Sequence, residues 1–337
     1  MLSRRLFAVL ALVGFAMAGC GREADETGAG DVGAVRFAVL SSEPAAVQEK
    51  VWSPIIADME ASTGLRVKPS FVNDGPALVE AMGRRKIDLG WFSNQAGLEA
   101  VRKAGGEVFA RPMAAQGVGD DYSILIVSAH SKVTLERVLN CDRTLTLGVG
   151  EVRSTSSSLA PETYLFGARG MWPARCFRQV RRGSHEANLA AVAGGQLDVA
   201  ATSTAWLARL PSRMAASQVR EIWRSPVLPA NPILWRRDMD PAIKEKLRQF
   251  FLTYGQGDSP QAAAQRANLA KIGVGGFTPA DDSHLRPARE MEATHLWLEA
   301  RESGDAARTA AARAALDAVT AERLALEART RAPAAAQ

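Results

Sequence analysis

Short apolar runs alternate with amphipathic segments along most of the chain, and this alternation constrains the fold more than any other feature. The run 35–40 (VRFAVL) precedes a segment, 44–63, whose apolar residues recur at helical spacing. The same order is repeated by 65–72 with 76–85 and by 87–93 with 94–105. Alternation of this kind predicts an α/β fold, in which mostly parallel sheets are covered by helices on both faces.

The pattern continues through the middle of the chain. Further strand-like runs are 107–115, 122–129, 144–150, 177–182, 197–204, 221–229 and 231–239. Helical patterns are found at 133–140, directly after 150, at 185–195 and from Pro241 onward. Ligands of such sheets bind at the carboxyl ends of the strands, where loops lead into helices.

The size of the chain bears on its number of domains, and its charge on the kinds of ligand that it binds. Without its N-terminal segments the chain keeps about 300 residues, above the size at which one hydrophobic core stops growing, so two domains are expected. Apolar residues make up 47% of the chain, and the net charge is +5. The basic residues are scattered, without the aromatic-interleaved stripe of a nucleic-acid surface, which argues against nucleic-acid binding.

Residues 1–20 have the features of a lipoprotein export signal. Arg4 and Arg5 precede a 12-residue apolar core, LFAVLALVGFAM, which is too short to span a bilayer. Small residues lead directly into Cys20, the expected lipidation site, although an ordinary signal peptide with an incidental cysteine is the alternative. Residues 21–34 are expected to be a flexible tether. The mature protein is therefore expected in the cell envelope, held to a membrane by its lipid.

Two further cysteines, Cys141 and Cys176, each precede a strand-like run. The four histidines are spread along the chain, and no spacing matches a zinc site, so no metal site is predicted. If the two strands are neighbours, these cysteines are placed for a disulfide in an oxidising compartment. Buried free thiols are the alternative.

Four hydroxyl side chains stand in a row where a helix is expected to begin. In the stretch GEVRSTSSSLAPETYLFGA, Ser154, Thr155, Ser156 and Ser157 follow a strand-like run that ends at Gly150. The first turn of a helix has unpaired N–H groups and a positive dipole end, so it attracts anions. The run predicts either a binding site for a tetrahedral oxyanion or simple capping of the helix.

A second strand-to-helix turn places His185 at a comparable position. The turn belongs to the stretch GSHEANLAAVAGGQLDVA, in the same predicted half as the hydroxyl run. A lone histidine is more often packed or exposed than functional. Its place at a carboxyl-end loop makes it a candidate ligand for the same anion.

The chain resembles the PhnD-like family, the periplasmic substrate-binding proteins of phosphate, phosphite and phosphonate ABC transporters, over residues 35–280. The resemblance is carried, in order, by the stretches 58–82, 87–110, 122–128, 153–157, 184–200, 222–239 and 244–255. It implies a two-lobed periplasmic binding protein fold of type II with a two-strand hinge, crossing at YSILIVS and REIWRSP. The implied parts are lobe one (35–125 plus 224–285), lobe two (126–223) and a helical C-terminal extension (286–337).

The resemblance also implies the ligand-binding residues. In the family the Ser-Thr-Ser run and the histidine hold the phosphoryl oxygens, which assigns this role to Ser154, Thr155, Ser156 and His185. Further ligand-binding positions implied in the same way are Tyr122, Asn231, Ser42, Phe92 and Asn94.

The departures from the family pattern bear on the ligand. Ala205 replaces a glutamate and Asn231 an aspartate that accompany an aminoalkyl group, and Gly75 and Phe92 each replace a tyrosine. Another tyrosine corresponds to Asp121, with Tyr122 beside it. Without the two acidic groups, an ammonium group in a closed cleft would be uncompensated and costly. A small oxyanion without an amino group is therefore expected.

Two roles fit these features. The first is a solute-binding lipoprotein that captures a phosphonate, phosphite or phosphate for ABC transporter uptake and delivers it to the permease. The second is an oxyanion sensor, arsenate and arsenite included, that presents its ligand to a membrane histidine kinase. No cofactor is expected, and no hydrolase, zinc-protease or P-loop motif occurs, so an enzyme is not predicted. For the extension 286–337 a solvated helix is the default expectation, and docking on lobe one, dimerisation and partial disorder remain open.

Overall fold

The computed structural model describes residues 33–41, 43–114, 120–208, 210 and 217–331, and the chain from Ala34 onward forms one compact unit. The expected export signal and lipidation site Cys20, nearly all of the tether and Ser42 lie outside the described residues. Among the residues that are described, no helix is both long enough and apolar enough to cross a membrane.

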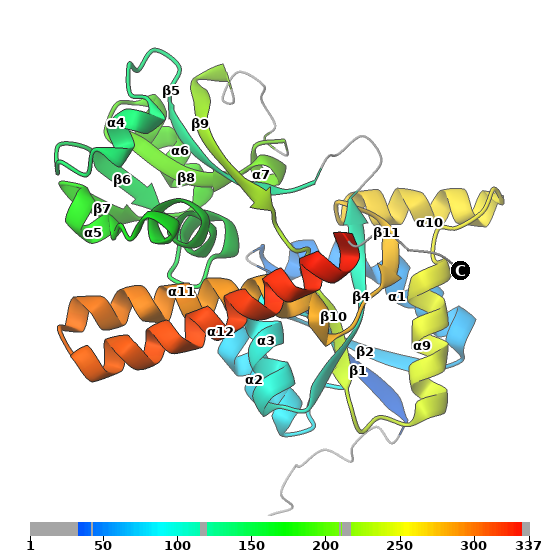
Figure 1. The fold of residues 1–337 in the computed structure, drawn as a ribbon. Coiled ribbons are helices and arrows are strands. Elements are labelled where there is room, and N and C mark those ends of the chain that lie inside the picture. The colour runs from blue at the N-terminus through cyan, green and yellow to red at the C-terminus, as the bar shows by residue number, and fades with distance from the viewer. Residues whose placement is uncertain (1–32, 42, 115–119, 209, 211–216, 332–337) are drawn as a thin grey trace, which may run out of the picture. The chain divides into compact units, whose positions relative to one another are not determined.

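The first sheet contains six strands in the order β11-β4-β10-β3-β1-β2 (Figure 1). Its strands are β1 (Ala34–Leu40), β2 (Arg66–Val72), β3 (Leu89–Trp91), β4 (Gly106–Ala114), β10 (Ile233–Arg236) and β11 (Val274–Pro279). The helices around it are α1 (Ala45–Thr63), α2 (Gly75–Gly83), α3 (Asn94–Lys103), α9 (Pro241–Thr253), α10 (Pro260–Lys271) and the short η4 (Asp282–Leu285).

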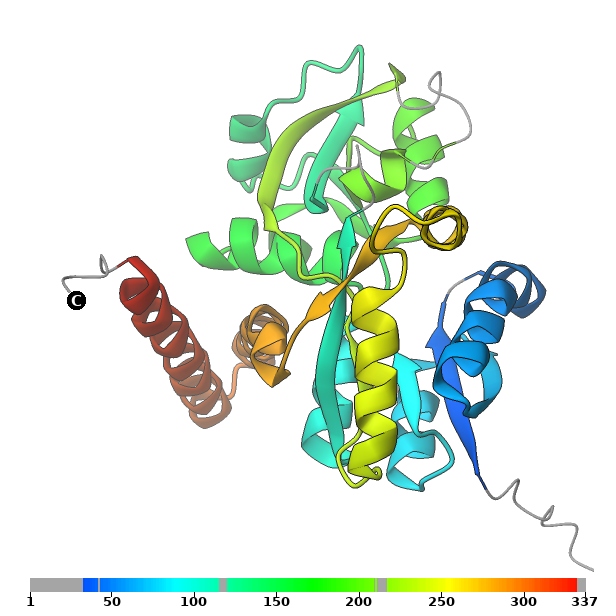
Figure 2. The same ribbon diagram turned by 90° about the vertical axis from the view of Figure 1, so that its right-hand side faces the viewer.

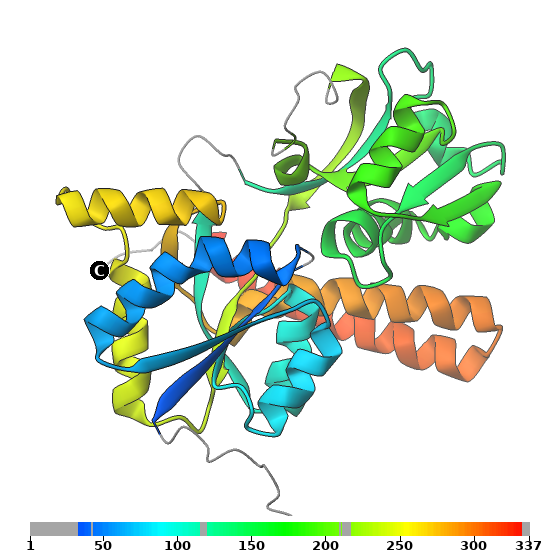
Figure 3. The same ribbon diagram turned by 180° about the vertical axis from the view of Figure 1, so that it is seen from behind.

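Helices cover both faces of the first sheet because successive side chains of each strand point to opposite faces. Phe37 and Val39 pack in one cluster with α1 and α9, whereas Ala38 belongs to the cluster with α2 and α3. Trp235 stacks on Phe109 in the first cluster, with ring centroids 3.9 Å apart. Figure 3 shows α1 beside β1 and β2, and Figure 2 shows α9 against β4 and β11.

The second sheet contains five strands in the order β7-β6-β8-β5-β9. Its strands are β5 (Tyr122–Ser128), β6 (Thr146–Val149), β7 (Gln179–Arg182), β8 (Val199–Ser203) and β9 (Val219–Val227). The helical segments around it are α4 (Leu135–Leu139), η1 (Thr155–Leu159), η2 (Glu162–Phe166), η3 (Gly167–Arg169), α5 (Pro173–Cys176), α6 (His185–Ala193) and α7 (Thr204–Ala208).

Two sheets flanked by helices confirm the predicted α/β class, but the pairing is mixed rather than mostly parallel. Strand β1 is parallel to β2 and β3, and β6 is parallel to β7 and β8, as strand–helix–strand units require. The pairs made by β4, β5, β9, β10 and β11 are antiparallel. Strand β11 was not predicted, because its sequence VGGFTP carries two glycines and little strand signal.

The expected lobe boundaries, at residues 125 and 224, fall inside the two strands that were expected to cross between the lobes. Strand β5 pairs with β9 along its whole length, from Tyr122 opposite Val227 to Ser128 opposite Val219. Both strands therefore belong entirely to the second sheet, and the boundaries expected at 125 and 224 lie within them. The chain leaves the first sheet before Tyr122 and returns after Val227.

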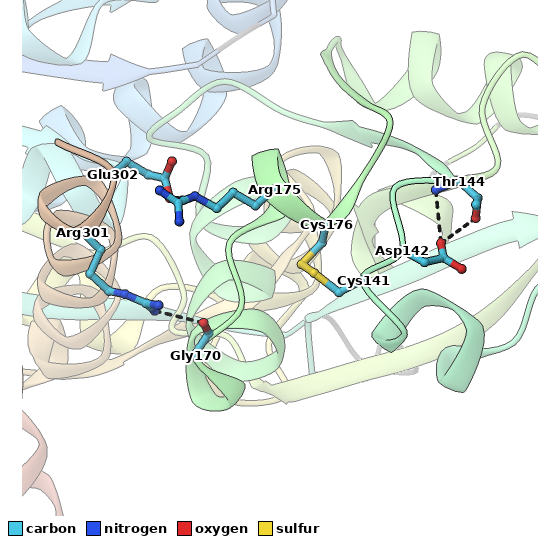
Figure 4. The surroundings of a disulfide bond; sticks show 8 residues. All are labelled: Cys141, Asp142, Thr144, Gly170, Arg175, Cys176, Arg301 and Glu302. Carbon is cyan, nitrogen blue, oxygen red and sulfur yellow. Dashed lines mark hydrogen bonds and ion pairs between the residues drawn. A yellow bond between two sulfur atoms is a disulfide. The ribbon is translucent and has the colours of Figure 1, made fainter. Parts of the chain in front are cut away.

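Cys141 and Cys176 form a disulfide beside the parallel pair β6 and β7 (Figure 4). Cys176 is buried in the core of the second sheet, and the backbone N–H of Arg143 donates to its carbonyl at 3.0 Å. The neighbouring strands expected from the sequence thus bring the two residues together.

The C-terminal extension folds into two helices, α11 (Arg286–Ser303) and α12 (Ala306–Arg331), which lie side by side (Figure 1). Helix α11 is docked rather than solvated. Met291 packs with Leu159 and Leu228, and Gln95 of α3 donates its amide to the carbonyl of Ala288 at 3.2 Å.

Ion pairs hold α11 to both sheets' helices. Arg102 of α3 pairs with Glu292, and Arg175 of α5 pairs with Glu302 at 2.7 Å (Figure 4). His295 Nδ1 lies 2.7 Å from Glu162 Oε2 of η2. The first half of α11 is therefore fixed to α3, and its second half to η2 and α5.

The hydrogen bond that His295 donates to the Glu162 carboxylate raises the pKa of His295, and the charges of Glu162 and Glu299 act in the same direction. A raised pKa in the folded state means that the pair stabilises the fold fully below about pH 6.5, the ordinary imidazole value, and that this contribution is lost as pH rises through the raised value. We expect the melting temperature of wild type to exceed that of His295→Gln at about pH 6, and this difference to shrink by about pH 9. His284, whose pKa is lowered by burial, is present in both proteins and cancels. A difference that stays constant with pH contradicts the prediction.

Candidate functional site

The carboxyl ends of the parallel strands β6, β7 and β8 lie at one edge of the second sheet, and a helical segment begins after each. Segment η1 follows β6, α6 follows β7, and α7 follows β8 directly. Three helix N-termini, each with unpaired N–H groups, therefore lie at the same edge of the sheet.

The hydroxyl run forms the first turn of η1. Ser154 is its N-cap, and its Oγ lies 2.7 Å from Ser157 Oγ. Thr155 and Ser156 are half-buried, whereas Ser157 is buried and turned inward. Segment η1 is a π-helix, in which Leu159 N donates to Ser154 O at 3.0 Å, five residues back. The backbone N–H groups of Thr155 and Ser156 lie at the helix start and have no helical acceptor, as an anion site requires.

Gly150 permits the close approach of the loop to this turn. A Cβ atom at Gly150 would lie 1.9 Å from Ser157 Oγ, so no larger residue fits there. Its N–H donates to Ser157 O at 3.0 Å, and its carbonyl accepts from Ser158 Oγ at 3.0 Å and from Arg182 Nη1 at 2.7 Å. The loop is therefore held rigidly against the start of η1.

His185 is the first residue of α6, which Ser184 caps. Its Nδ1 lies 2.8 Å from Thr202 Oγ1, and its ring stacks on Trp206, with centroids 5.3 Å apart. The imidazole is thus fixed between β8 and α7. The sequence did not single out Thr202 and Trp206, because their role depends on pairing between elements distant along the chain.

Tyr122 lies at the same edge, at the start of β5. Its N–H donates to Thr204 Oγ1 at 3.0 Å, and the Arg224 guanidinium lies 4.9 Å from the centre of its ring. The neighbouring Asp121 carboxylate accepts from the N–H of Ala205 at 2.9 Å and from Thr204 Oγ1 at 3.2 Å. Asp121 is thereby engaged by the first turn of α7.

The candidates on the first sheet form a second group. Asn94, the first residue of α3, is buried and donates its amide to Pro229 O at 2.8 Å and to Asn231 Oδ1 at 3.3 Å. Asn231 is exposed. Phe92, which was expected to contact ligand, has a fully buried side chain that packs with Leu78 in the core beneath α2 and α3.

An ion pair connects the loop before the hydroxyl run, at the second sheet, to a helix of the first sheet. Arg153, directly before the hydroxyl run, pairs with Glu99 of α3. Arg153 is exposed, and its charge is shared with a carboxylate of the first sheet's helices.

Other features of the described residues do not point to a different site. Two surface hollows, one lined by Arg111 and His284 and the other by Lys246 and Tyr254, contain none of the expected site residues. No cluster of three or more histidine, cysteine, aspartate or glutamate side chains suited to a metal ion is found in the described part of the chain.

Comparison with known proteins identifies the family. Residues 37–285 match the family model of the ABC transporter phosphonate periplasmic substrate-binding protein. The chain belongs to this family. It is therefore a periplasmic substrate-binding protein of the phosphonate ABC transporter type, and its family acts in transport rather than catalysis.

Individual relatives agree with the family assignment. The phosphonates-binding periplasmic protein of Escherichia coli (strain K12) is 33% identical over 261 residues, which cover 77% of this chain and 75% of that protein. A binding protein component of a Pseudomonas aeruginosa ABC phosphonate transporter is 34% identical, with a TM-score of 0.71, over 88% of this chain and 98% of that structure. PhnD1 of Prochlorococcus marinus (MIT 9301), solved with methylphosphonate, shares the fold at 18% identity and a TM-score of 0.62, over 77% of this chain and 96% of that structure.

Proposed function

We propose that the protein captures a small phosphorus oxyanion without an amino group, a phosphonate, phosphite or phosphate, and delivers it to an ABC permease. The observation that carries the proposal is the shared sheet edge that holds the first turn of η1 and His185. Hydroxyls, free N–H groups and a fixed imidazole there supply donors from several directions, as a tetrahedral anion requires. Membership of the phosphonate-binding family supports the ligand class.

The charges near this edge favour a ligand without an ammonium group. Ala205 and Asn231 carry no charge, and the Asp121 carboxylate is already bonded to the start of α7. An ammonium group enclosed beside Ala205 and Asn231 would find no carboxylate at either position and would cost several kcal/mol to desolvate.

Capture is proposed to occur by closure of the two sheet-centred lobes around the anion, after which the permease recognises the closed form. Asn94 and Asn231 would contribute from the first lobe, and Tyr122 from the second. Presentation of the same closed form to a sensor kinase is the alternative use of this site, and a kinase gene next to this one would favour it.

The export signal supports lipid attachment at Cys20 and hence anchoring to a membrane of the envelope. Metabolic labelling with a radioactive fatty acid is expected to mark wild type and not Cys20→Ala. Equal labelling of both proteins would remove the anchor from the proposal.

A ligand screen tests the proposed function. Thermal shift and titration calorimetry with phosphate, phosphite, methylphosphonate, 2-aminoethylphosphonate, arsenate, arsenite and sulfate are expected to show the tightest binding for phosphite, phosphate or methylphosphonate. At a ligand concentration of 100 Kd, binding adds about 2.7 kcal/mol to the free energy of unfolding, which is readily measured. Tightest binding of 2-aminoethylphosphonate would refute the charge argument, and no binding to any phosphorus compound would refute the function.

A further inference from the structure

We propose that Ser123 of β5 and Thr202 of β8 are positioning residues that hold the two anion-binding groups, the first turn of η1 and His185, in place. The inference rests on the proposed function, because it names what orients that site. Both side chains are fully buried, and neither was expected at the site.

Ser123 acts on η1. Its Oγ donates to the carbonyl of Ser156 at 2.5 Å, while its N–H donates to Ser225 Oγ at 3.0 Å. The N–H of the same Ser156–Ser157 peptide group points to Ser154 Oγ at 3.4 Å. This peptide group is held at both ends, so the turn that presents Thr155 and Ser156 is fixed relative to the sheet.

Thr202 acts on His185. Its Oγ1 contacts Nδ1 at 2.8 Å, and Trp206 limits rotation of the ring by stacking on it. The contact at Nδ1, together with the stacking, fixes the plane of the imidazole and with it the direction of Nε2, the other ring nitrogen. Thr202 thereby sets the direction in which His185 meets a ligand.

The strand pair places one hydroxyl on each face of the sheet. Ser123 lies opposite Ser203, and Thr202 lies opposite the next residue, Ile124, so the alternation of side chains turns them to opposite faces. Leu125 and Val127, on the side of Ser123, pack with Leu165 and Phe166 of η2. Ile124 and Ile126, on the side of Thr202, pack with Leu189 and Val192 of α6.

The hydroxyls of Ser123 and Thr202 border apolar segments of their strands. On one side along β5 and β8 their neighbours are apolar and buried (Ile124, Leu125, Ala200 and Ala201), whereas Tyr122 and Ser203 flank them on the other side. A buried hydroxyl costs free energy unless it is hydrogen-bonded, so an apolar side chain would serve packing alone equally well. The bonds to Ser156 and His185 give the hydroxyls a role that packing does not.

Titration calorimetry of the full chain tests the proposal, with methylphosphonate as probe, or phosphite if wild type binds it more tightly. We expect Ser123→Ala and Thr202→Val each to weaken binding by about 3- to 10-fold, the effect of one lost hydrogen bond. Thr202→Ser keeps the hydroxyl and is expected to stay within about 2-fold of wild type.

Ser225→Ala is the matched control. Ser225 is buried on the adjacent strand β9, and its Oγ bonds to Ser123 N and Pro226 O but to neither anion-binding group. It is expected to lower the melting temperature as the test variants do, and to leave the affinity within about 2-fold of wild type.

A double-mutant cycle separates positioning from general destabilisation. Thr202→Val is expected to weaken binding in the wild-type background and to have no further effect in His185→Ala, because its action passes through the imidazole. An equal effect in both backgrounds, or unchanged affinity in both Ser123→Ala and Thr202→Val, overturns the inference. If His185→Ala and Ser154→Ala bind like wild type, the anion binds elsewhere and the inference fails, whereas the proposed function fails only if wild type binds no phosphorus compound.

Discussion

Replacement of Ser154 and Thr155 together by alanine is expected to weaken oxyanion binding by at least about 30-fold without unfolding the protein. Each lost donor to a buried anion costs about 1–3 kcal/mol, and every 1.4 kcal/mol is a factor of ten in Kd. Both hydroxyls belong to the first turn of η1, at the sheet edge that also holds His185. Titration calorimetry with methylphosphonate and phosphite measures the change.

The control for this double variant must lower the stability of the fold by a similar amount. Ser154 is an N-cap, and loss of a cap removes about 1 kcal/mol of stability in any helix. Ser259 caps α10 of the first sheet by accepting from Ala262 N at 3.0 Å, far along the chain from the hydroxyl run. Ser259→Ala should lower stability comparably and leave Kd unchanged. Wild-type affinity in the Ser154 and Thr155 double variant would exclude this turn as the binding site.

Removal of the disulfide by Cys141→Ala with Cys176→Ala is expected to lower the free energy of unfolding by about 2–4 kcal/mol. The two cysteines are 35 residues apart, and cross-linking a loop of that length restricts the unfolded chain considerably. Cys176 is buried among the core residues of the second sheet, so the loss of its sulfur also affects packing. Urea unfolding at neutral pH provides the measurement.

Reduction gives an independent test of the same bond. Wild type treated with a thiol reductant should unfold at nearly the same urea concentration as the double alanine variant, whereas the variant should not respond to reductant. If reductant leaves wild type as stable as before, the cross-link contributes nothing to the fold.

Much of the architecture followed from local patterns in the sequence. The periodic apolar segments at Ala34–Leu40, Ala45–Thr63 and Arg66–Val72 formed the expected strand, helix and strand, because burial of one apolar face determines such elements. The neighbouring strands β6 and β7, which bring the two cysteines together, belong to the same alternating pattern.

What the sequence did not reveal depends on contacts between distant elements. Thr202 meets His185 across 17 residues, and Ser123 meets Ser156 across 33. Phe92 was assigned to the ligand by resemblance, yet its side chain is fully buried in the core, against Gly90. The docking of α11 was undecided because alanine- and charge-rich helices look alike whether or not a partner buries one side.

The docking of α11 has a consequence for how this molecule moves. At 18 residues the helix is about 27 Å long; near its middle Glu292 pairs with α3 and His295 with η2, and near its C-terminal end Glu302 pairs with α5. A swing of one sheet away from the other cannot keep both sets of ion pairs at contact distance. If the lobes open to release the ligand, as proposed above, one set of these ion pairs must break or shift, so part of the free energy of opening goes into the contacts of α11.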